Sequence, residues 1–298
     1  MLQTIAEHGS FAAAARALGM VPSALTYRVR QLEDGLDVLL FDRSARQARP
    51  TAAGRELLRE AERLLHELDA VANRVRRVAT GWEAVLTVAV DGVVAREPLM
   101  DLCADFLALQ APTRLRLRHE NLSGTLAALT SGQADLALGV LIEPGMRHEL
   151  QQQPMGDVRF VYAVAPQHPL AQMPEPLTER QLQQHRAVAV ADSVVRGQGM
   201  TVGLMGGQEV FTVPDLASKL SAQLRGLGGG FLPESVARPW IASGRLVERQ
   251  VAKPRVEHAR YLWREGRDAP PGKALRWWLD RLAKPRTRRA LLQHPQPV

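Results

Sequence analysis

Two consecutive runs of apolar positions at helical spacing open the chain. The first covers residues 11–18 and ends just before Gly19, and the second places apolar residues at i, i+4, i+7 and i+11 (Leu25, Val29, Leu32, Leu36). Apolar residues three and four positions apart share one face of a helix. The pattern therefore predicts two short helices joined by a tight turn, the arrangement of a helix-turn-helix motif.

The other side of the second predicted helix is polar. Ser23, Thr26, Tyr27 and Arg30 fall opposite the apolar positions, and the alanines of residues 12–15 allow the two helices to approach closely. A polar helix face of this kind can enter the major groove of DNA. An ordinary helical hairpin with a solvated face is the alternative for this segment alone.

A short basic loop follows the second helix. Arg43, Arg46 and Arg49 lie in a loop that contains Pro50, at the position of a wing. Arginines there can contact phosphates or enter a minor groove, where the negative potential favours them. Taken alone, three arginines in a loop also fit an ordinary solvated surface.

A long helix with a heptad pattern is predicted over residues 51–79. Its apolar residues are separated by alternating steps of four and three, at Leu57, Ala61, Leu64, Leu68, Val71, Val75 and Val78. A repeat of 3.5 residues favours supercoiling against another helix, so this segment is predicted to be a dimerisation helix. Thr51 is suited to cap its start and Gly81 to end it. The alternative is a single long helix packed on its own domain.

Beyond Gly81 the pattern changes to alternating short strands and helices. Strands are predicted at residues 85–90, 114–120 and 135–140 with helices between them, a βαβαβ series that predicts a parallel or mixed sheet with helices on both faces. A second such unit follows, with strands at 160–166, 187–191, 210–213 and 228–233 and helices near 178–184 and 215–225; the chain returns through a strand at 260–265 and a helix at 272–282.

A chain that leaves one α/β lobe near residue 163 and re-enters it near residue 263 forms two lobes joined by two crossing segments. Ligands of such folds bind outside the carboxyl ends of the strands, where helix N-termini point toward them. The sequence therefore predicts a cleft between two lobes that binds a small molecule.

Together, residues 11–18, the SALTYRVRQLE run, LLFDRS and the TAAG of residues 51–54 resemble LysR-type transcriptional regulators. The resemblance implies an α/β chain with three parts: a winged helix-turn-helix DNA-binding domain (1–50), a linker and dimerisation helix (51–80) and a two-lobed effector-binding domain (84–290), which is similar to periplasmic binding proteins. Lobe I covers about 84–162 and 264–290, and lobe II about 163–263.

The resemblance also implies site residues. The DNA-binding residues are Pro22, Ser23, Thr26, Tyr27, Arg30, Arg43 and Arg46. The effector cleft involves Asp91, Gly92, Val93, Asn121, Ser123, Gly139, Val140, Leu141, Asp192, Ser193, Val194 and Phe211. The family usually has Gln-Pro at Pro22-Ser23 and often Arg at Tyr27, so the base readout of its members does not transfer to this chain.

Several of these cleft residues also have structural interpretations. Asp91, Ser123 and Asp192 are suited to cap helices, and Phe211 fits a core position. A carboxylate at Asp91 would repel an anionic ligand unless it caps a helix or is neutralised. A phenol, an amine, a neutral aromatic compound and an aromatic acid therefore all remain open as the inducer.

Composition adds limits to this interpretation. A net charge of +7 fits a polyanionic partner, and the basic residues are spread along the chain with a cluster at 281–289. Cys103 is the only cysteine, which excludes an intrachain disulfide and suits a small apolar filler. No signal peptide or membrane-length apolar run is visible, so a soluble, cytoplasmic protein is expected.

The sequence contains none of three motifs typical of catalytic sites, which are a nucleotide-binding glycine loop, a metal-binding histidine pattern and a nucleophile elbow. The Gly-rich segment 225–231 lacks GxGxxG order and a following Lys-Ser/Thr pair, and is interpreted as a helix end leading into a buried strand. The histidines lack metal-ligand spacing, and no GxSxG elbow occurs. We therefore expect a protein that is not an enzyme and that needs no cofactor or metal.

The leading hypothesis is a ligand-responsive, sequence-specific transcriptional regulator that forms a homodimer or homotetramer on double-stranded operator DNA with dyad symmetry, with RNA polymerase as a candidate partner. The alternatives are a solute-binding module with a helical protein-interaction arm, and a protein that compacts DNA without sequence preference. Binding to a defined dyad site separates the first from both others. Residues 1–8 supply only about two turns of the first helix, fewer than the family normally has, which favours a start that is truncated or misassigned.

Overall fold

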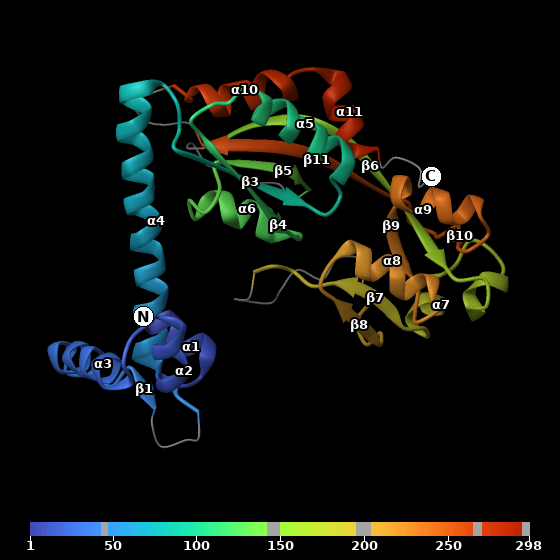
Figure 1. The fold of residues 1–298 in the computed structure, drawn as a ribbon. Helices are drawn as coiled ribbons and strands as arrows, with labels where there is room; N and C mark the ends of the chain where they lie inside the picture. Colours follow the sequence, from blue (N-terminus) through green and yellow to red (C-terminus); the bar gives the residue numbers. More distant parts are fainter. Residues whose placement is uncertain (43–46, 142–149, 195–203, 265–269, 294–298) are drawn as a thin grey trace. The chain divides into compact units, whose positions relative to one another are not determined.

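A computed structural model describes residues 1–42, 47–141, 150–194, 204–264 and 270–293. The chain divides into two compact units, Met1–Val71 and Ala72–Val298 (Figure 1). The wing residues Arg43 and Arg46 lie outside the described residues.

The N-terminal unit begins with the predicted helix-turn-helix. It contains α1 (Leu2–His8), α2 (Phe11–Ala17) and α3 (Pro22–Leu36). The Ser10 side chain caps α2 by accepting a hydrogen bond from the Ala13 N–H at 3.4 Å. Gly19 takes a φ of +64°, which suits glycine, and so allows the tight turn before α3. Pro22 starts α3, where its fixed φ is favourable.

The core of this unit joins all three helices. Ile5, Ala14, Ala15, Leu25, Val29, Leu40 and Phe41 form one fully buried cluster. The predicted apolar positions Leu32 and Leu36 instead lie exposed near the end of α3. Glu33 is buried between them because its carboxylate accepts hydrogen bonds from the backbone N–H groups of Leu40 (2.9 Å) and Phe41 (3.3 Å).

The wing strands and the long helix follow. β1 (Phe41–Asp42) pairs antiparallel with β2 (Arg49–Pro50), and α4 runs over Ala52–Thr80. The Thr51 hydroxyl accepts a hydrogen bond from the Gly54 N–H at 3.0 Å, as expected of a cap. A Cβ atom on Gly54 would lie 2.0 Å from the Leu40 carbonyl oxygen, so only glycine fits this close approach. The helix ends at Gly81, whose φ is +77°.

The C-terminal unit starts with the predicted βαβαβ series. It consists of β3 (Val85–Asp91), α5 (Arg96–Ala108), β4 (Arg114–Glu120), α6 (Ser123–Thr130) and β5 (Leu136–Val140). β3 lies between β4 and β5 and pairs parallel with both. The alternation of strands and helices in the sequence thus predicted this lobe correctly.

Two long antiparallel strands connect the lobes. β6 (Leu150–Val164) and β11 (Arg255–Arg264) pair along most of their length and extend well beyond the predicted strands 160–166 and 260–265. β11 also pairs with β5, while the far end of β6 pairs with β9 (Gly230–Pro233) and β10 (Val247–Arg249). The result is one mixed seven-stranded sheet of order β10-β6-β11-β5-β3-β4, with β9 also on β6.

The second lobe differs from the predicted second βαβ unit. Its segments 160–166 and 228–233 belong to the seven-stranded sheet, and β7 (Ala187–Val190) and β8 (Val210–Val213) form a separate parallel pair. The helical elements there are a 3-10 turn (Pro169–Gln172), α7 (Glu179–Gln183), α8 (Leu216–Leu224) and α9 (Glu234–Ala242). α10 (Lys273–Leu282) and α11 (Pro285–Leu292) complete the chain against the first lobe. α9 and α11 were not predicted.

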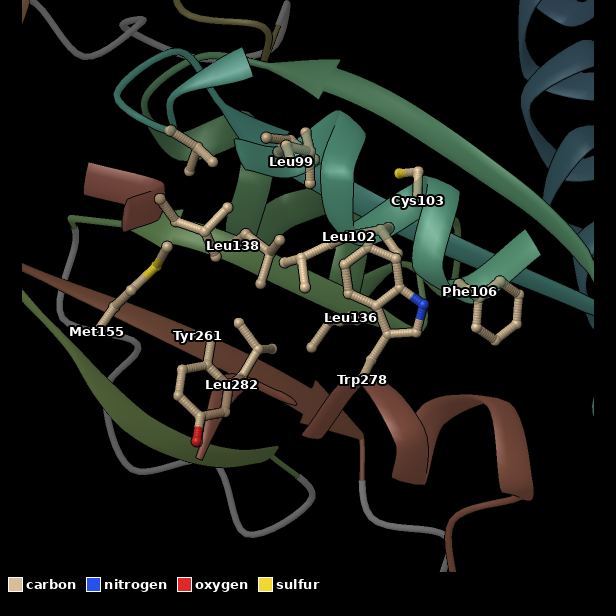
Figure 2. Close-up of a cluster of buried hydrophobic side chains, with 14 of the residues drawn as sticks. Leu99, Leu102, Cys103, Phe106, Leu136, Leu138, Met155, Tyr261, Trp278 and Leu282 are labelled. Atoms are coloured by element: carbon tan, nitrogen blue, oxygen red, sulfur yellow. The ribbon is translucent and has the colours of Figure 1, made fainter. Parts of the chain in front are cut away.

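The main core lies between the sheet and the helices α5, α10 and α11. Figure 2 shows Leu99, Cys103 and Phe106 of α5 facing Leu138 of β5 and Trp278 of α10. Fully burying side chains of this size stabilises the fold by about 1.5–3 kcal/mol each. Cys103 is an apolar filler as predicted, and burial raises the pKa of its thiol to about 11.

α6 covers the opposite face of the sheet, where Leu129 packs with Ala137, Val140 and Leu262. Helices therefore lie on both faces, as predicted. Of the helices that the structure describes, none combines the length and apolarity needed to cross a membrane.

Candidate functional site

One face of α3 presents polar side chains to solvent. Leu25 and Val29 are fully buried on the inner face. Tyr27 is 63% exposed on the outer face, and its hydroxyl accepts a hydrogen bond from the Gln31 amide at 3.1 Å. The other predicted DNA-binding residues of this helix are exposed (Pro22, Ser23, Arg30) or half-buried (Thr26). Hydroxyl and guanidinium groups together supply donors and acceptors suited to base edges and phosphates.

The start of α3 is also open. Val21 precedes the helix and offers no side-chain cap, so the first backbone N–H groups of α3 are not satisfied by a capping side chain. Such groups favour a phosphate at the helix N-terminus. Arg49 lies exposed on β2, in the wing.

A line of apolar side chains is exposed along α4. Leu64, Leu68, Val71 and Val75 are between 45% and 65% exposed. Leu57, the first residue of the predicted seam, instead packs against the core of the N-terminal unit, and Ala61 is half-buried. Among the described side chains, the exposed apolar positions of the heptad therefore begin at Leu64.

A pocket of about 70 Å³ lies where the two lobes face each other. The first lobe lines it with residues that follow β3, β4 and β5, at the carboxyl ends of these strands. The second lobe and the connecting strands supply the other walls. The lining residues are Asp91, Gly92, Val93, Asn121, Leu122, Leu141, Phe160, Ala189, Val190, Leu216, Lys219, Phe231, Pro233 and Arg255.

Asp91 is held by the protein itself. Its carboxylate accepts hydrogen bonds from the backbone N–H groups of Val93 (3.0 Å) and Leu122 (3.1 Å) and from the Thr125 hydroxyl (3.4 Å). Burial raises the pKa of Asp91 to about 7, against the effect of these three donors and with a smaller contribution from the negative charge of Asp192. Leu122, at the start of α6, takes a φ of +53°, a strained value for a leucine. Asp91 therefore holds the start of α6 against β3.

The predicted residues Asn121, Ser123, Asp192 and Ser193 join the two lobes beside the pocket. The Ser123 hydroxyl donates to Asp192 at 2.6 Å, the Asn121 N–H donates to the Ser193 hydroxyl at 2.8 Å, and the Asn121 side chain donates to the Pro214 carbonyl at 2.7 Å. We call this group of hydrogen bonds the interlobe latch. It lies between the loop before α6 and the ends of β7 and β8.

Other predicted cleft residues do not line the described pocket. Gly139 and Val140 are buried in the sheet, and Val194 donates its N–H to Asp192 at 3.1 Å. Phe211 is exposed on β8, in neither the pocket nor the core. Of the residues predicted as cleft, Asp91, Gly92, Val93, Asn121 and Leu141 meet in the pocket.

Two cationic side chains of the pocket were not predicted. Lys219 of α8 is 9% exposed, and burial lowers the pKa of its ammonium group to about 8, with the Arg255 charge as the second cause. Arg255 of β11 donates to Glu257 at 2.8 Å and lies over the Phe160 ring at 4.5 Å. The sequence signal for Lys219 is a lysine on the face of α8 that also carries the buried Ala222 and Gln223.

The histidines and the Gly-rich segment are the other candidate sites in the sequence. Within the described residues, no group of three or more His, Cys, Asp or Glu side chains is arranged to hold a metal ion. In the Gly-rich segment, Gly226 follows α8 with a φ of +72° and β9 begins at Gly230. This segment is therefore a helix end and a buried strand, as predicted.

Comparison with known proteins matches two parts of the chain to family models. Residues 1–55 match the family model described as "Bacterial regulatory helix-turn-helix protein, lysR family", and residues 79–285 match "LysR substrate binding domain". The uncharacterized HTH-type transcriptional regulator YeeY of Escherichia coli (strain K12) is 35% identical over 95% of this chain and 91% of its own length.

Solved structures of full-length regulators share the fold. LysG from Corynebacterium glutamicum with bound effector Arg is 22% identical, with a TM-score of 0.53 over 99% of this chain and 98% of that one. CbnR in complex with its target DNA is 19% identical, with a TM-score of 0.60 over 95% and 97% of the two chains. With its helix-turn-helix, its two-lobed α/β domain and these matches along nearly its whole length, the chain belongs to the LysR family of transcriptional regulators.

Proposed function

We propose that this regulator reads a dyad-symmetric operator with the outer face of α3, dimerises through α4 and responds to a small molecule bound between the lobes of its C-terminal domain. The homodimer is the basic unit, and a homotetramer is two such units on one operator. RNA polymerase is the candidate protein partner at the promoter.

The observation that carries the DNA-binding part is the division of α3 into two faces. Leu25 and Val29 are fully buried, while Ser23, Tyr27 and Arg30 are exposed on a helix whose N-terminus has no side-chain cap. A recognition helix needs such a combination, because the buried face fixes its position and the exposed face contacts base edges. CbnR, with which the chain shares its fold, was solved on target DNA.

The experiment is to select operator sequences from random DNA with the wild type and with single variants. Thr26→Ala and Tyr27→Ala are expected to change the sequences selected. Arg43→Ala and Arg49→Ala are expected to weaken binding to all sequences alike and to reduce the slope of log affinity against log salt concentration by about 1. Equal losses on operator and random DNA for all four variants would contradict the assignment of α3 to the major groove.

The exposed apolar line on α4 supports dimerisation. A carboxylate placed at Leu68 would be desolvated in a helix–helix seam, which is strongly unfavourable. Leu68→Asp is therefore expected to abolish the dimer and, with it, high-affinity operator binding. Leu65, which is 61% exposed, lies one position outside the predicted heptad, so Leu65→Asp is the matched control with a smaller expected effect. An unchanged sedimentation profile for Leu68→Asp would contradict the seam.

The effector site is supported by the pocket and the interlobe latch. A ligand that contacts both lobes binds better when they are closed, and only such differential affinity can shift a conformational equilibrium. LysG, a fold relative, was solved with an arginine effector. Calorimetry with the full-length protein, together with operator binding with and without ligand, tests whether occupation of this pocket changes DNA affinity.

A further inference from the structure

Lys219 is the most unusual residue of the pocket. Its side chain is more than nine-tenths buried, and it lines both the 70 Å³ pocket and a smaller adjoining cavity of about 10 Å³. Within the part of the chain that the structure describes, its ammonium group has no hydrogen-bond or ion-pair partner. A buried charge without a partner is costly, so proteins rarely keep one without a use for it.

Three other cations of this lobe each pair with a carboxylate of the protein. Lys253 pairs with Glu179 at 2.8 Å on the surface, and Arg249 pairs with Glu175 at 3.2 Å. Arg255, the second cation of the pocket, pairs with Glu257 and lies near two phenylalanine rings. Lys219 differs from all three because no carboxylate of the described residues pairs with it, while its side chain lines the pocket.

Negative groups of the protein near the pocket are already occupied. Asp91 accepts three hydrogen bonds at the start of α6, and Asp215 caps α8 by accepting from the Ser218 N–H at 2.7 Å. The carboxylates of Asp91 and Asp215 thus already accept hydrogen bonds from the protein, at the loop before α6 and at the start of α8. Lys219 and Arg255 are the pocket side chains that can pair with an anionic ligand, and a cationic ligand would find no free carboxylate at Asp91.

Apart from Asp91 and Asn121, the side chains of the remaining pocket wall are apolar. Leu141, Phe160, Val190, Leu216 and Phe231 line it from five different elements or loops, and the Arg255 guanidinium lies near the rings of Phe160 and Phe231. Pockets with a few placed polar groups in an apolar lining select ligands by the position of the polar group and the shape of the apolar part. The volume of about 70 Å³ suits a compact molecule.

We propose that the pocket binds a small organic carboxylate with a compact apolar body, such as a single ring or a branched alkyl group, whose carboxylate pairs with the Lys219 ammonium beside Arg255. The proposal rests on the pocket's proposed role as the effector site. It narrows the inducer from the four classes that the sequence left open to the acid.

The test is a set of matched acids, amides, alcohols and amines on the full-length protein: benzoate, benzamide, benzyl alcohol and benzylamine, and isovalerate with its amide, alcohol and amine. Thermal shift at millimolar concentration ranks them, and calorimetry gives affinities. Benzoate or isovalerate is expected to stabilise the wild type more than its neutral and cationic counterparts. Lys219→Gln is expected to weaken acid binding by about 30-fold or more, as expected when a buried charged partner is removed.

Two variants act as controls. Lys253→Gln removes the same charge from the surface of the same lobe and is expected to leave acid affinity unchanged. Lys219→Arg keeps the charge and is expected to retain more acid affinity than Lys219→Gln. The melting temperature and ligand-free operator affinity of each variant are measured first, because neither depends on the proposed ion pair.

The proposal is overturned if no acid stabilises the wild type more than its amide, or if an acid binds Lys219→Gln as tightly as the wild type. In either case, operator binding by the wild type would still support the proposed function. If the wild type bound no operator sequence preferentially, the proposed function would be rejected, and the class of ligand that binds the pocket would still be decided by the acid and amide affinities.

Discussion

The two walls of the interlobe pocket each carry a buried ionisable side chain, and these two side chains differ in whether the protein supplies hydrogen-bond partners for them. On the first lobe, the Asp91 carboxylate accepts hydrogen bonds from two backbone N–H groups and a hydroxyl. On the second lobe, Lys219 is equally enclosed but has no such partner among the described residues. A charged residue in a pocket is thus available to a ligand only where the fold leaves it unsatisfied.

The difference changes how the pocket is interpreted. From sequence, Asp91 is the conspicuous charge of the cleft and argues against an anionic ligand. In the structure three protein donors occupy the Asp91 carboxylate, whereas the Lys219 ammonium group in the same pocket has no protein partner among the described residues. Predictions that disturb one wall and leave the other intact can therefore separate the two roles.

The largest effect is expected for Asp91→Ala, and it is an effect on stability. The substitution leaves the Val93 and Leu122 N–H groups without their acceptor, at a cost of roughly 1–3 kcal/mol for each buried donor. Urea unfolding of the full-length protein measures this loss. Asp157→Ala is the control, since Asp157 pairs with His258 on the exposed surface, and its effect should stay within about 0.5 kcal/mol. Equal stability of the two variants would show that Asp91 is not part of the scaffold.

A smaller effect is expected from forcing the two walls apart. A Cβ atom on Gly124 would lie 2.4 Å from the Cβ of Ser193, so Gly124→Ala displaces the second lobe at the interlobe latch. Overpacking of this kind costs about 1–3 kcal/mol, and acid and amide ligands should lose affinity alike because the change does not involve Lys219. Gly206→Ala is the control, because nothing lies within 4 Å of its added Cβ. Unchanged ligand affinity in Gly124→Ala would mean that the latch does not shape the pocket.

The third prediction is a pH dependence that belongs to Lys219. Arg255, Asp91 and the Tyr162 hydroxyl are the other ionisable groups on the cavities that Lys219 lines, and burial raises the pKa of Tyr162, so this hydroxyl stays neutral. Burial lowers the pKa of Lys219 to about 8, so its charge is present below pH 8 and lost above it. Acid affinity should fall by about tenfold between pH 7 and pH 9.

Ionisation of Asp91, whose pKa is raised to about 7, acts in the same direction, because its negative charge grows as pH rises. Amide affinity should stay flat, and Lys219→Arg should remove most of the pH dependence of acid affinity. An acid affinity that is constant from pH 7 to pH 9 in the wild type would exclude Lys219 as the partner of the carboxylate.

Local periodicity predicted the fold where elements are amphipathic and their neighbours are close in sequence. The helices α2, α3 and α4, and the β3–α5–β4–α6–β5 series, follow from apolar spacing and from glycines at their ends. The first half of β6 was missed because its QQQPMGDVR sequence lacks alternating apolar residues, and its strand structure comes from pairing with β11. α9 was missed because it contains Pro239, which normally argues against a helix.

The site was only partly predictable, for a related reason. Residues directly after a predicted strand, such as Asp91 and Asn121, can be placed at the carboxyl edge of a sheet from sequence order alone. Lys219 and Arg255 come from the middle of a helix and the start of a strand, and they meet only because β6 and β11 run continuously between the lobes. Long-range pairing of this kind leaves no local signal.

A crystal structure of the full-length protein with a bound acid from the panel tests the central claim most directly. We expect the ligand carboxylate within hydrogen-bonding distance of the Lys219 Nζ atom, roughly 2.7–2.9 Å, with Asp91 still bound to Val93, Leu122 and Thr125. A carboxylate placed instead at the start of α6 or α8, with the carboxylates of Asp91 or Asp215 displaced and Lys219 untouched, would contradict the account.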